Sequence, residues 1–223
     1  MIGFFSRYGK KLWLIFFLAN AGLVCAGSFE DYFDAVKQDN AAKVNQLLVK
    51  GFDANTVNSE SQNGLYLAMR EPSPKVVQAL MNWPKTNINN LNAQGESVLM
   101  MAAIKGDFEL ADRLIKKGAD VNKTNWTPLH YAASGGHTQL ISLLLENSAY
   151  IDAESPNGTT PLMMAAMYGS ESAVKLLLQE GADVKIKNNQ GLTALEFAQR
   201  GKRPDAVSAI AAAIKSKQPA GRW

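Results

Sequence analysis

His130 and His137 are the only two histidines of the chain, and they are its first candidates for chemistry. An imidazole can ligate a metal ion or act as a general base, but each role needs partner side chains close by. The sequence holds no second cluster of ligating or acidic residues that would supply such partners. We therefore expect neither a metal site nor a catalytic base at these histidines.

Methionines form a second pattern that could do chemistry. Paired methionines, and the spacing of Met164 and Met167, would suit copper in an exported protein, because thioethers are soft ligands. Packing is the alternative, since Met101 and Met164 align on the helix face that we expect to be buried, and methionine fills irregular core space well. We favour packing, and we expect no metal and no cofactor.

Asp53, Asp120 and Asp183 occupy one position of a recurring turn. Three carboxylates could form a site, but each lies in a separate segment, and we expect those segments to stand roughly 10 Å apart. Aspartate in a turn commonly hydrogen-bonds the local backbone. The sequence also has no Gly-rich phosphate loop, no Ser-His-Asp candidate and no acid pair in a plausible cleft. We therefore predict no catalytic residues and no enzymatic activity.

Residues 127–152 predict two short helices joined by a turn. Pro128 suits the first position of a helix, where its missing N–H costs nothing. Gly135 and Gly136 then end that helix. Apolar residues at 140–145 return at helical spacing and give the second helix a broad apolar face. One such pair cannot bury both of its faces, so it needs copies of itself on either side.

The sequence supplies those copies. The motif TPL at 127–129 returns as TPL at 160–162 and as TAL at 193–195, each thirty-three residues further on. A fixed period of that length is typical of a stacked array of repeats. The sequence TPLHYAASGGH, the leucine triplet that follows it and the turn GADVN at 118–122 resemble the ankyrin repeat. The resemblance implies an all-α fold, a solenoid of helix-turn-helix repeats with short hairpin-like fingers.

We assign six repeats, which form one domain over residues 27–217. Their predicted bounds are 28–57, 58–90, 91–123, 124–153, 154–186 and 187–217, and residues 218–223 form a tail. Repeat two departs most from the pattern, because Pro72 and Pro74 replace the glycine break between its helices. The finger between repeats three and four is shortened by three residues and carries Trp126. The resemblance implies that His130 and His137 hydrogen-bond loop backbone.

Residues 1–26 have the three parts of a secretory signal peptide. Its basic region is formed by Arg7, Lys10 and Lys11. Residues 12–24 are apolar, but about half as long as a membrane-spanning helix requires. Small residues predict cleavage after Ala26, with Ala21 as the second choice. Lipidation of Cys25 and an uncleaved anchor are two further alternatives.

The charges of the remaining chain balance. Three of the 23 basic residues precede residue 27 and no acid does, so 20 basic and 20 acidic residues follow. We therefore expect no nucleic-acid partner. Cys25 is the only cysteine, so a chain cleaved after Ala26 has no thiol and suits an oxidising compartment. We expect a monomer without membrane contact after signal removal, located in a bacterial periplasm or secreted.

The resemblance implies that a partner protein binds the concave face, which is formed by the fingers and the ends of each repeat's first helix. Transferring those positions to this sequence gives eight partner-binding candidates: Arg70, Ile104, Lys105, Trp126, Ser134, Met167, Tyr168 and Arg200. Trp, Tyr and Arg are frequent binding hot spots. Further finger positions are Glu96, Thr159 and Leu192. Trp126 has an alternative role, since its ring could instead pack against the neighbouring repeat.

These features predict a non-catalytic module that binds, and in one version of the hypothesis stabilises, a partner protein in the periplasm. The resemblance to exported bacterial ankyrin proteins suggests a periplasmic enzyme as that unidentified partner. The alternative is a secreted effector that binds a host protein. A location outside the cell rather than in the periplasm would favour this alternative.

Overall fold

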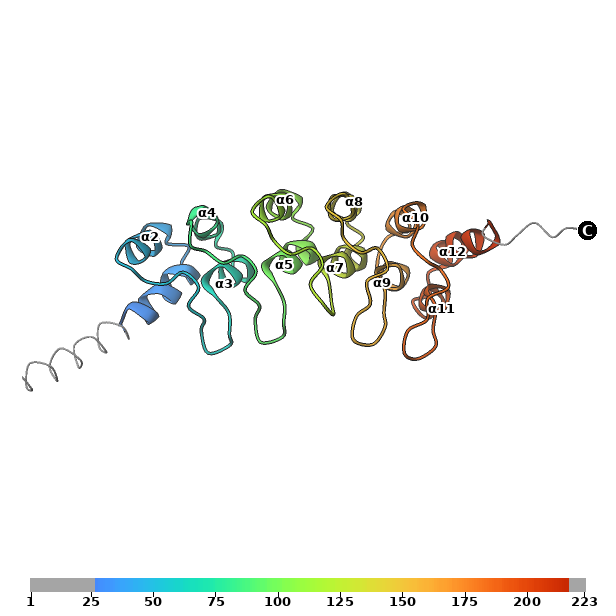
Figure 1. Ribbon diagram of the computed structural model, residues 1–223, viewed down its shortest axis with the longest axis horizontal. Helices are drawn as coiled ribbons and strands as arrows, with labels where there is room; N and C mark the ends of the chain where they lie inside the picture. The colour runs from blue at the N-terminus through green and yellow to red at the C-terminus, as the bar shows by residue number, and fades with distance from the viewer. Residues whose placement is uncertain (1–26, 217–223) are drawn as a thin grey trace, which may run out of the picture. The chain divides into compact units, whose positions relative to one another are not determined.

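The computed structural model describes residues 27–216, which fold as pairs of short α-helices (Figure 1). The chain divides into two compact units, unit 1 up to Asn87 and unit 2 from Ile88 onward. Within the described residues the only strand-like pairing is a bridge between Val57 and Asn63. The predicted all-α class is confirmed. The predicted signal peptide, residues 1–26, and the tail, residues 218–223, lie outside the described residues.

Unit 1 contains two helix pairs in its described part. The helix over residues 27–37 pairs with α2 (Ala41–Val49), and α3 (Gly64–Arg70) pairs with α4 (Pro74–Asn82). The second helices α2 and α4 contact each other. The fully buried Tyr32 holds the unit together: its hydroxyl donates to the Ala54 carbonyl at 3.3 Å, and its ring packs on Phe52 with centroids 4.5 Å apart.

The second helix pair of unit 1 departs from the repeat pattern at the start of each of its two helices. Gly64 opens α3 because a side chain is excluded there: a Cβ on Gly64 would overlap the Tyr32 hydroxyl. Pro74 takes the first position of α4, as the sequence predicts, and the preceding Ser73 makes no capping bond. Asp39, from the turn before α2, instead accepts a hydrogen bond from the Val76 N–H at 2.9 Å. A carboxylate at a helix N-terminus is favourable, so the preceding repeat caps α4.

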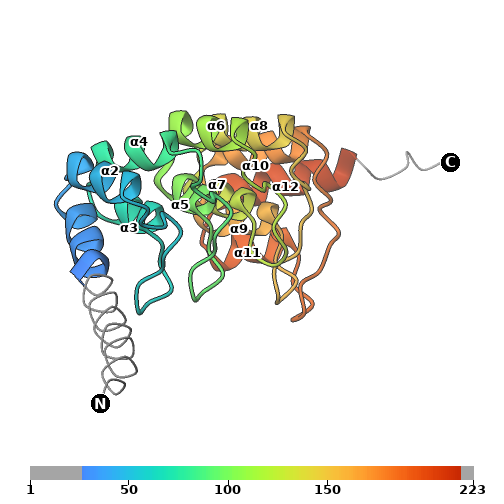
Figure 2. The same ribbon diagram turned by 60° about the vertical axis from the view of Figure 1, so that its left-hand side comes forward.

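Unit 2 stacks four helix pairs, each with an inner first helix and an outer second helix (Figure 2). The inner helices are α5 (Val98–Lys105), α7 (Pro128–Gly135), α9 (Pro161–Tyr168) and α11 (Ala194–Arg200). The outer helices are α6 (Phe108–Lys116), α8 (Thr138–Glu146), α10 (Glu171–Gln179) and α12 (Pro204–Ser216). Consecutive helices of each kind contact one another. The described residues therefore contain six helix pairs across both units, as the repeat pattern predicts.

Small side chains allow the inner helices of unit 2 to approach one another. An alanine recurs at one register position and is fully buried in every case; these residues are Ala102, Ala132, Ala165 and Ala198. Buried leucines precede them in the first turn at Leu99, Leu129 and Leu162. This alternation of small and large residues gives the close packing of a protein interior.

In each inner helix of unit 2, the side chain of the third residue accepts a hydrogen bond from the backbone of the N-cap residue, which directly precedes the helix. The backbone N–H of that N-cap residue donates to the sulfur of Met100 in α5 at 3.3 Å, and to the sulfur of Met163 in α9 at 3.4 Å. The carboxylate of Glu196 accepts the equivalent bond in α11 at 2.8 Å, and a ring nitrogen of His130 accepts it in α7 at 3.2 Å. Thioether, carboxylate and imidazole therefore fill one structural role.

The fingers close through a recurring asparagine turn. Asn92 in unit 2 accepts bonds from the N–H groups two and four residues later, at 3.0 and 2.8 Å, and Asn188 does the same at 3.0 Å. The connection between α6 and α7, residues 117–127, is three residues shorter than residues 147–160 between α8 and α9. The predicted shortening is confirmed, and within unit 2 Figure 1 shows this loop as the shortest finger.

Candidate protein-binding surface

Seven of the eight predicted partner-binding residues lie in unit 2, and Arg70 lies in unit 1. Six of the seven lie in the last turn of an inner helix: Ile104, Lys105, Ser134, Met167, Tyr168 and Arg200. Ile104 is 44% exposed and Tyr168 is 58% exposed. Lys105 and Arg200 are also exposed, whereas Ser134 and Met167 are half-buried. Because the four inner helices contact one another in order, these residues form one row of adjacent positions.

A second row was missed by sequence reasoning. The fourth residue after each N-cap of unit 2 is large, apolar and half-buried; these residues are Met101, Tyr131, Met164 and Phe197. The expectation that Met101 and Met164 face the core is wrong, because the fully buried methionines are their neighbours Met100 and Met163, each 1% exposed. The half-buried row lies three residues before Ile104 and its equivalents, and therefore on the same helix face. The second row could have been predicted from the sequence, because a residue three positions before Ile104 or its equivalents lies on the same face of the helix.

The apolar members of the two rows form a surface along unit 2. We call it the apolar strip and define it by Met101, Ile104, Tyr131, Met164, Met167, Tyr168 and Phe197. Large exposed apolar patches on soluble proteins commonly mark interaction sites. Aromatic residues and methionine are enriched in protein–protein interfaces, and the strip consists almost entirely of these types.

Trp126, on the shortened finger, packs on the helix of its own repeat. Its ring lies 5.2 Å from that of His130 with the planes at 73°, and 6.3 Å from that of Tyr131 with the planes at 42°. The side chain is half-buried. The ring therefore packs on His130 and Tyr131 of its own repeat and extends the apolar strip at its finger side.

His130 is fully buried and joins two repeats. Its Nδ1 accepts from the Thr127 N–H at 3.2 Å and lies 2.9 Å from the Thr127 hydroxyl. Its Nε2 then carries the proton and donates to the Thr159 carbonyl oxygen at 2.9 Å. Burial lowers the pKa of His130 to about 4, so the ring is neutral at pH 7. His130 thus acts as a structural link between α7 and the finger that leads into α9.

His137 also bonds backbone, as the resemblance implies. Its Nε2 lies 3.3 Å from the Ile104 carbonyl oxygen of the preceding repeat. Gly106, which ends α5 with a φ of 69°, leaves room for this ring, because a Cβ there would lie 2.6 Å from it. Across residues 27–216, no group of three or more His, Cys, Asp or Glu is placed to hold a metal ion.

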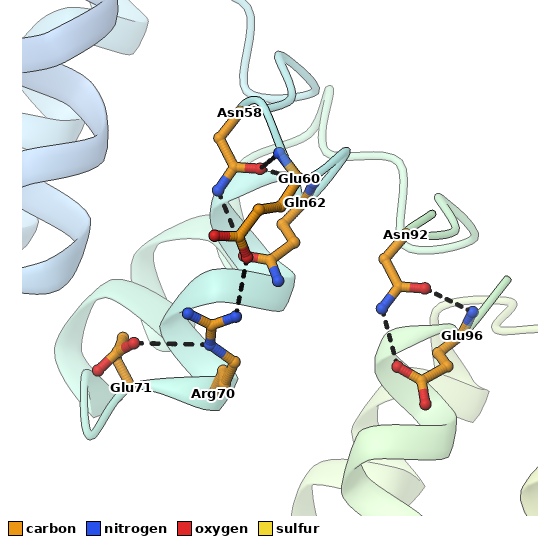
Figure 3. Close-up of polar contacts among 7 residues, drawn as sticks. All are labelled: Asn58, Glu60, Gln62, Arg70, Glu71, Asn92 and Glu96. Atoms are coloured by element: carbon orange, nitrogen blue, oxygen red, sulfur yellow. Dashed lines mark hydrogen bonds and ion pairs between the residues drawn. The ribbon is translucent and has the colours of Figure 1, made fainter. Parts of the chain in front are cut away.

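Two finger positions have local roles. Thr159 is only 2% exposed, so the expectation that it contacts a partner is wrong. Its carbonyl oxygen instead accepts a hydrogen bond from His130. Glu96 accepts from the side-chain amide of Asn92 at 2.8 Å (Figure 3). Burial, and then the negative charge of Glu96, raises the pKa of Tyr131. Glu96 thus places a carboxylate near the finger side of the apolar strip.

In unit 1, Arg70 is engaged by acidic residues of its own unit. Its guanidinium lies 3.1 Å from the Glu60 carboxylate, on the finger, and 3.6 Å from the Glu71 carboxylate (Figure 3). Asn58 and Gln62 of the same finger are joined by a side-chain hydrogen bond of 3.2 Å. The exposed end of α3 is therefore a polar network, with its cation held between two carboxylates.

Helix length bears on membrane association. Over residues 27–216, every helix is too short or too polar to cross a bilayer.

Comparison with known proteins identifies the repeats. A family model described as ankyrin repeats (3 copies) matches residues 33–125, 65–155, 99–188 and 150–218. The Notch-regulated ankyrin repeat-containing protein of Xenopus tropicalis is 34% identical over 89 residues, which cover 37% of this chain and 78% of that protein.

Two solved structures are similar along most of the chain. The ankyrin repeat protein EF0377 has a TM-score of 0.71 and 28% identity, over 81% of this chain and 96% of that one. A chain from the complex of the predatory endopeptidase Bd0816 of Bdellovibrio bacteriovorus with the immunity protein Bd3460 has a TM-score of 0.70 and 28% identity. That match covers 84% of this chain and 98% of the other.

Proposed function

The chain belongs to the ankyrin repeat family, and we propose that it is a non-catalytic module that holds a partner protein on the apolar strip of unit 2. Ankyrin repeats are a protein–protein interaction module. The observation that carries the proposal is the strip itself, in which four consecutive inner helices present methionine, isoleucine and aromatic side chains at equivalent positions. Burying such side chains against a partner gives the hydrophobic free energy that drives association.

The proposed mechanism is a preformed surface. Each inner helix is fixed by buried alanine residues, joined in α5, α7 and α9 by a buried leucine. In addition, His130 of α7 is bonded to Thr159, at the end of the finger that leads into α9. The strip residues are thus held at a constant spacing before the partner arrives. Preorganisation lowers the entropic cost of binding, which raises affinity without additional contacts.

We propose export to the periplasm and an exported enzyme as the partner. The three-part sequence of residues 1–26 supports export. The similarity to a chain from a complex of an endopeptidase with its immunity protein supports an enzyme as the partner, bound so that it is stabilised or held in check. A secreted effector that binds a host protein is the competing proposal. Fractionation of cells into periplasm and medium distinguishes the two.

A cross-linked pull-down from periplasmic extract tests the binding proposal. The intact protein is compared with Ile104→Ser/Tyr168→Ser, which removes two exposed apolar side chains from the strip. Tyr150→Ser is the matched control, because Tyr150 is 68% exposed in the turn after α8 and outside the strip. We expect one partner that the intact protein and the control retain and the double variant loses. Equal capture by all three proteins would refute the strip as the binding site.

A further inference from the structure

We infer that the apolar strip of unit 2 binds an amphipathic α-helix of the partner, with acidic side chains along the edge that faces the ends of the inner helices. The inference rests on the proposed function and specifies the class of segment that occupies the same surface.

The backbone of unit 2 favours a helical partner over an extended one. An extended peptide leaves its N–H and C=O groups open and commonly pairs them with the edge of a sheet. The described part of unit 2, residues 88–216, contains no β-strand and so offers no such edge. A helix satisfies its own backbone groups, so it can lie on an apolar surface without leaving buried polar groups unpaired.

The dimensions of the strip suit a single helix. Packed helices lie about 8–10 Å apart, so the distance from α5 to α11 is roughly 24–30 Å. A helix with a rise of about 1.5 Å per residue covers that distance with roughly 16–20 residues. Three of the strip residues are methionines, Met101, Met164 and Met167. Their flexible side chains can adapt to the ridges of a helix surface.

The charges beside the strip specify the edge of that helix. The last two residues of each inner helix include two cations, Lys105 and Arg200, and no carboxylate, and a third cation, Lys202, lies two residues beyond the end of α11. All three side chains are exposed. The nearest acid in sequence, Asp107, turns its carboxylate back to the Leu110 N–H at 3.0 Å. Acidic residues on the bound helix would meet these cations, which favours correct orientation and fast association.

A selection experiment tests the class of ligand directly. Random peptides of about twenty residues, displayed on phage, are selected on the full chain after depletion on Ile104→Asp/Tyr168→Asp. We expect enriched sequences with apolar residues at positions i, i+3, i+4 and i+7 and an excess of Asp and Glu over Lys and Arg. Alternating apolar residues, a basic excess, or no enrichment would each overturn the inference. If the pull-down succeeds and this selection fails, the proposed function survives and only the helical acidic ligand is rejected.

A pair of charge variants tests the acidic edge. The affinity of an enriched peptide is measured for Lys105→Glu/Arg200→Glu and for the control Lys117→Glu/Lys185→Glu, which reverses two exposed lysines in turns away from the strip. We expect about fivefold weaker binding for the first variant, because exposed ion pairs contribute up to about 1 kcal/mol each. The control is expected to change affinity less than about twofold. Equal effects in the two variants would show attraction by net charge and overturn the specific edge.

Discussion

Arg70 in unit 1 and Met167 in unit 2 occupy equivalent positions, each seven residues after the N-cap of a first helix. Arg70 is held by Glu60 and Glu71 of its own unit, whereas Met167 is half-buried and belongs to the apolar strip. One position of the repeat is thus used for internal contacts in one unit and left available in the other. The repeat register determines which residues reach the surface, and the neighbouring side chains determine whether they can bind a partner.

The largest expected difference between the units is in their response to acid, since both histidines lie in unit 2. Burial lowers the pKa of His130 in the folded state from 6.5 to about 4. Between these values the unfolded chain binds a proton that the folded chain excludes, so stability is full above pH 6.5 and falls toward pH 4. The loss amounts to about 3 kcal/mol. Urea unfolding of unit 2 at several pH values measures it.

His130→Met is the matched variant for this experiment, because Met100 and Met163 fill the same position in the adjacent repeats. The variant is expected to be less stable at pH 7, since the bond to Thr159 is lost, but to lack the pH dependence. A slope that persists in His130→Met would assign the acid sensitivity to other groups.

Gly64→Ala should produce the next largest effect, and in unit 1. The added Cβ would overlap the hydroxyl of the buried Tyr32 and displace its bond to Ala54, at a cost of about 2 kcal/mol. Amide hydrogen exchange should show reduced protection in α3 and α4. Gly27→Ala is the control, because nothing lies within 4 Å of a Cβ at Gly27. Equal stability of the two variants would contradict the close approach of Tyr32.

The cap of α4 tests the irregular part of unit 1 at a smaller scale. Asp39→Gly removes the acceptor for the Val76 N–H, while glycine tolerates the positive φ of 51°. The free energy of unfolding should fall by about 1 kcal/mol. Asp39→Asn keeps a side-chain oxygen at this point and should retain most of the stability. Thermal melts compare the three proteins, and identical melting temperatures would show that the cap contributes little.

The smallest effect is expected at Arg70, although the sequence places it among the partner-binding candidates. Exposed ion pairs contribute little, so Arg70→Ala should lower stability by less than about 0.5 kcal/mol. Partner capture should remain unchanged, because the Arg70 guanidinium is engaged by Glu60 and Glu71. Quantitative pull-down beside Tyr168→Ser checks this. A loss at Arg70 equal to that at Tyr168 would remove the distinction between the units.

Much of the fold was predictable because the repeat fixes local geometry. Pro128 and Gly135 mark the bounds of α7, and the missing three residues before Trp126 correspond to the short finger. The hydrogen bonds of His130 to loop backbone also followed from its place in the repeat. Residue type and spacing were sufficient for the bounds of α7 and the short finger, whereas the bonds of His130 were implied by the resemblance to the ankyrin repeat.

The exposed face was less predictable because it depends on contacts between segments. Met100 and Met101 are adjacent and chemically identical, yet Met100 is 1% exposed and its sulfur accepts from the Ser97 N–H, whereas Met101 is half-buried on the strip. The engagement of Arg70 likewise requires the finger to bring Glu60 to it from ten residues away. The repeat period of the sequence places such residues near the surface, but it does not determine which side chains of the same chain they contact.

The two methionine pairs also provide an internal probe of occupancy. Peroxide converts accessible thioethers to sulfoxides, and the two members of each pair differ in access: Met100 and Met163 are 1% exposed, whereas Met101 and Met164 are half-buried on the strip. A bound partner would shield the second member of each pair and leave the first as an unchanged reference in the same proteolytic fragment. The ratio of oxidation within a pair would then report, by mass spectrometry and without any label, whether the surface is covered.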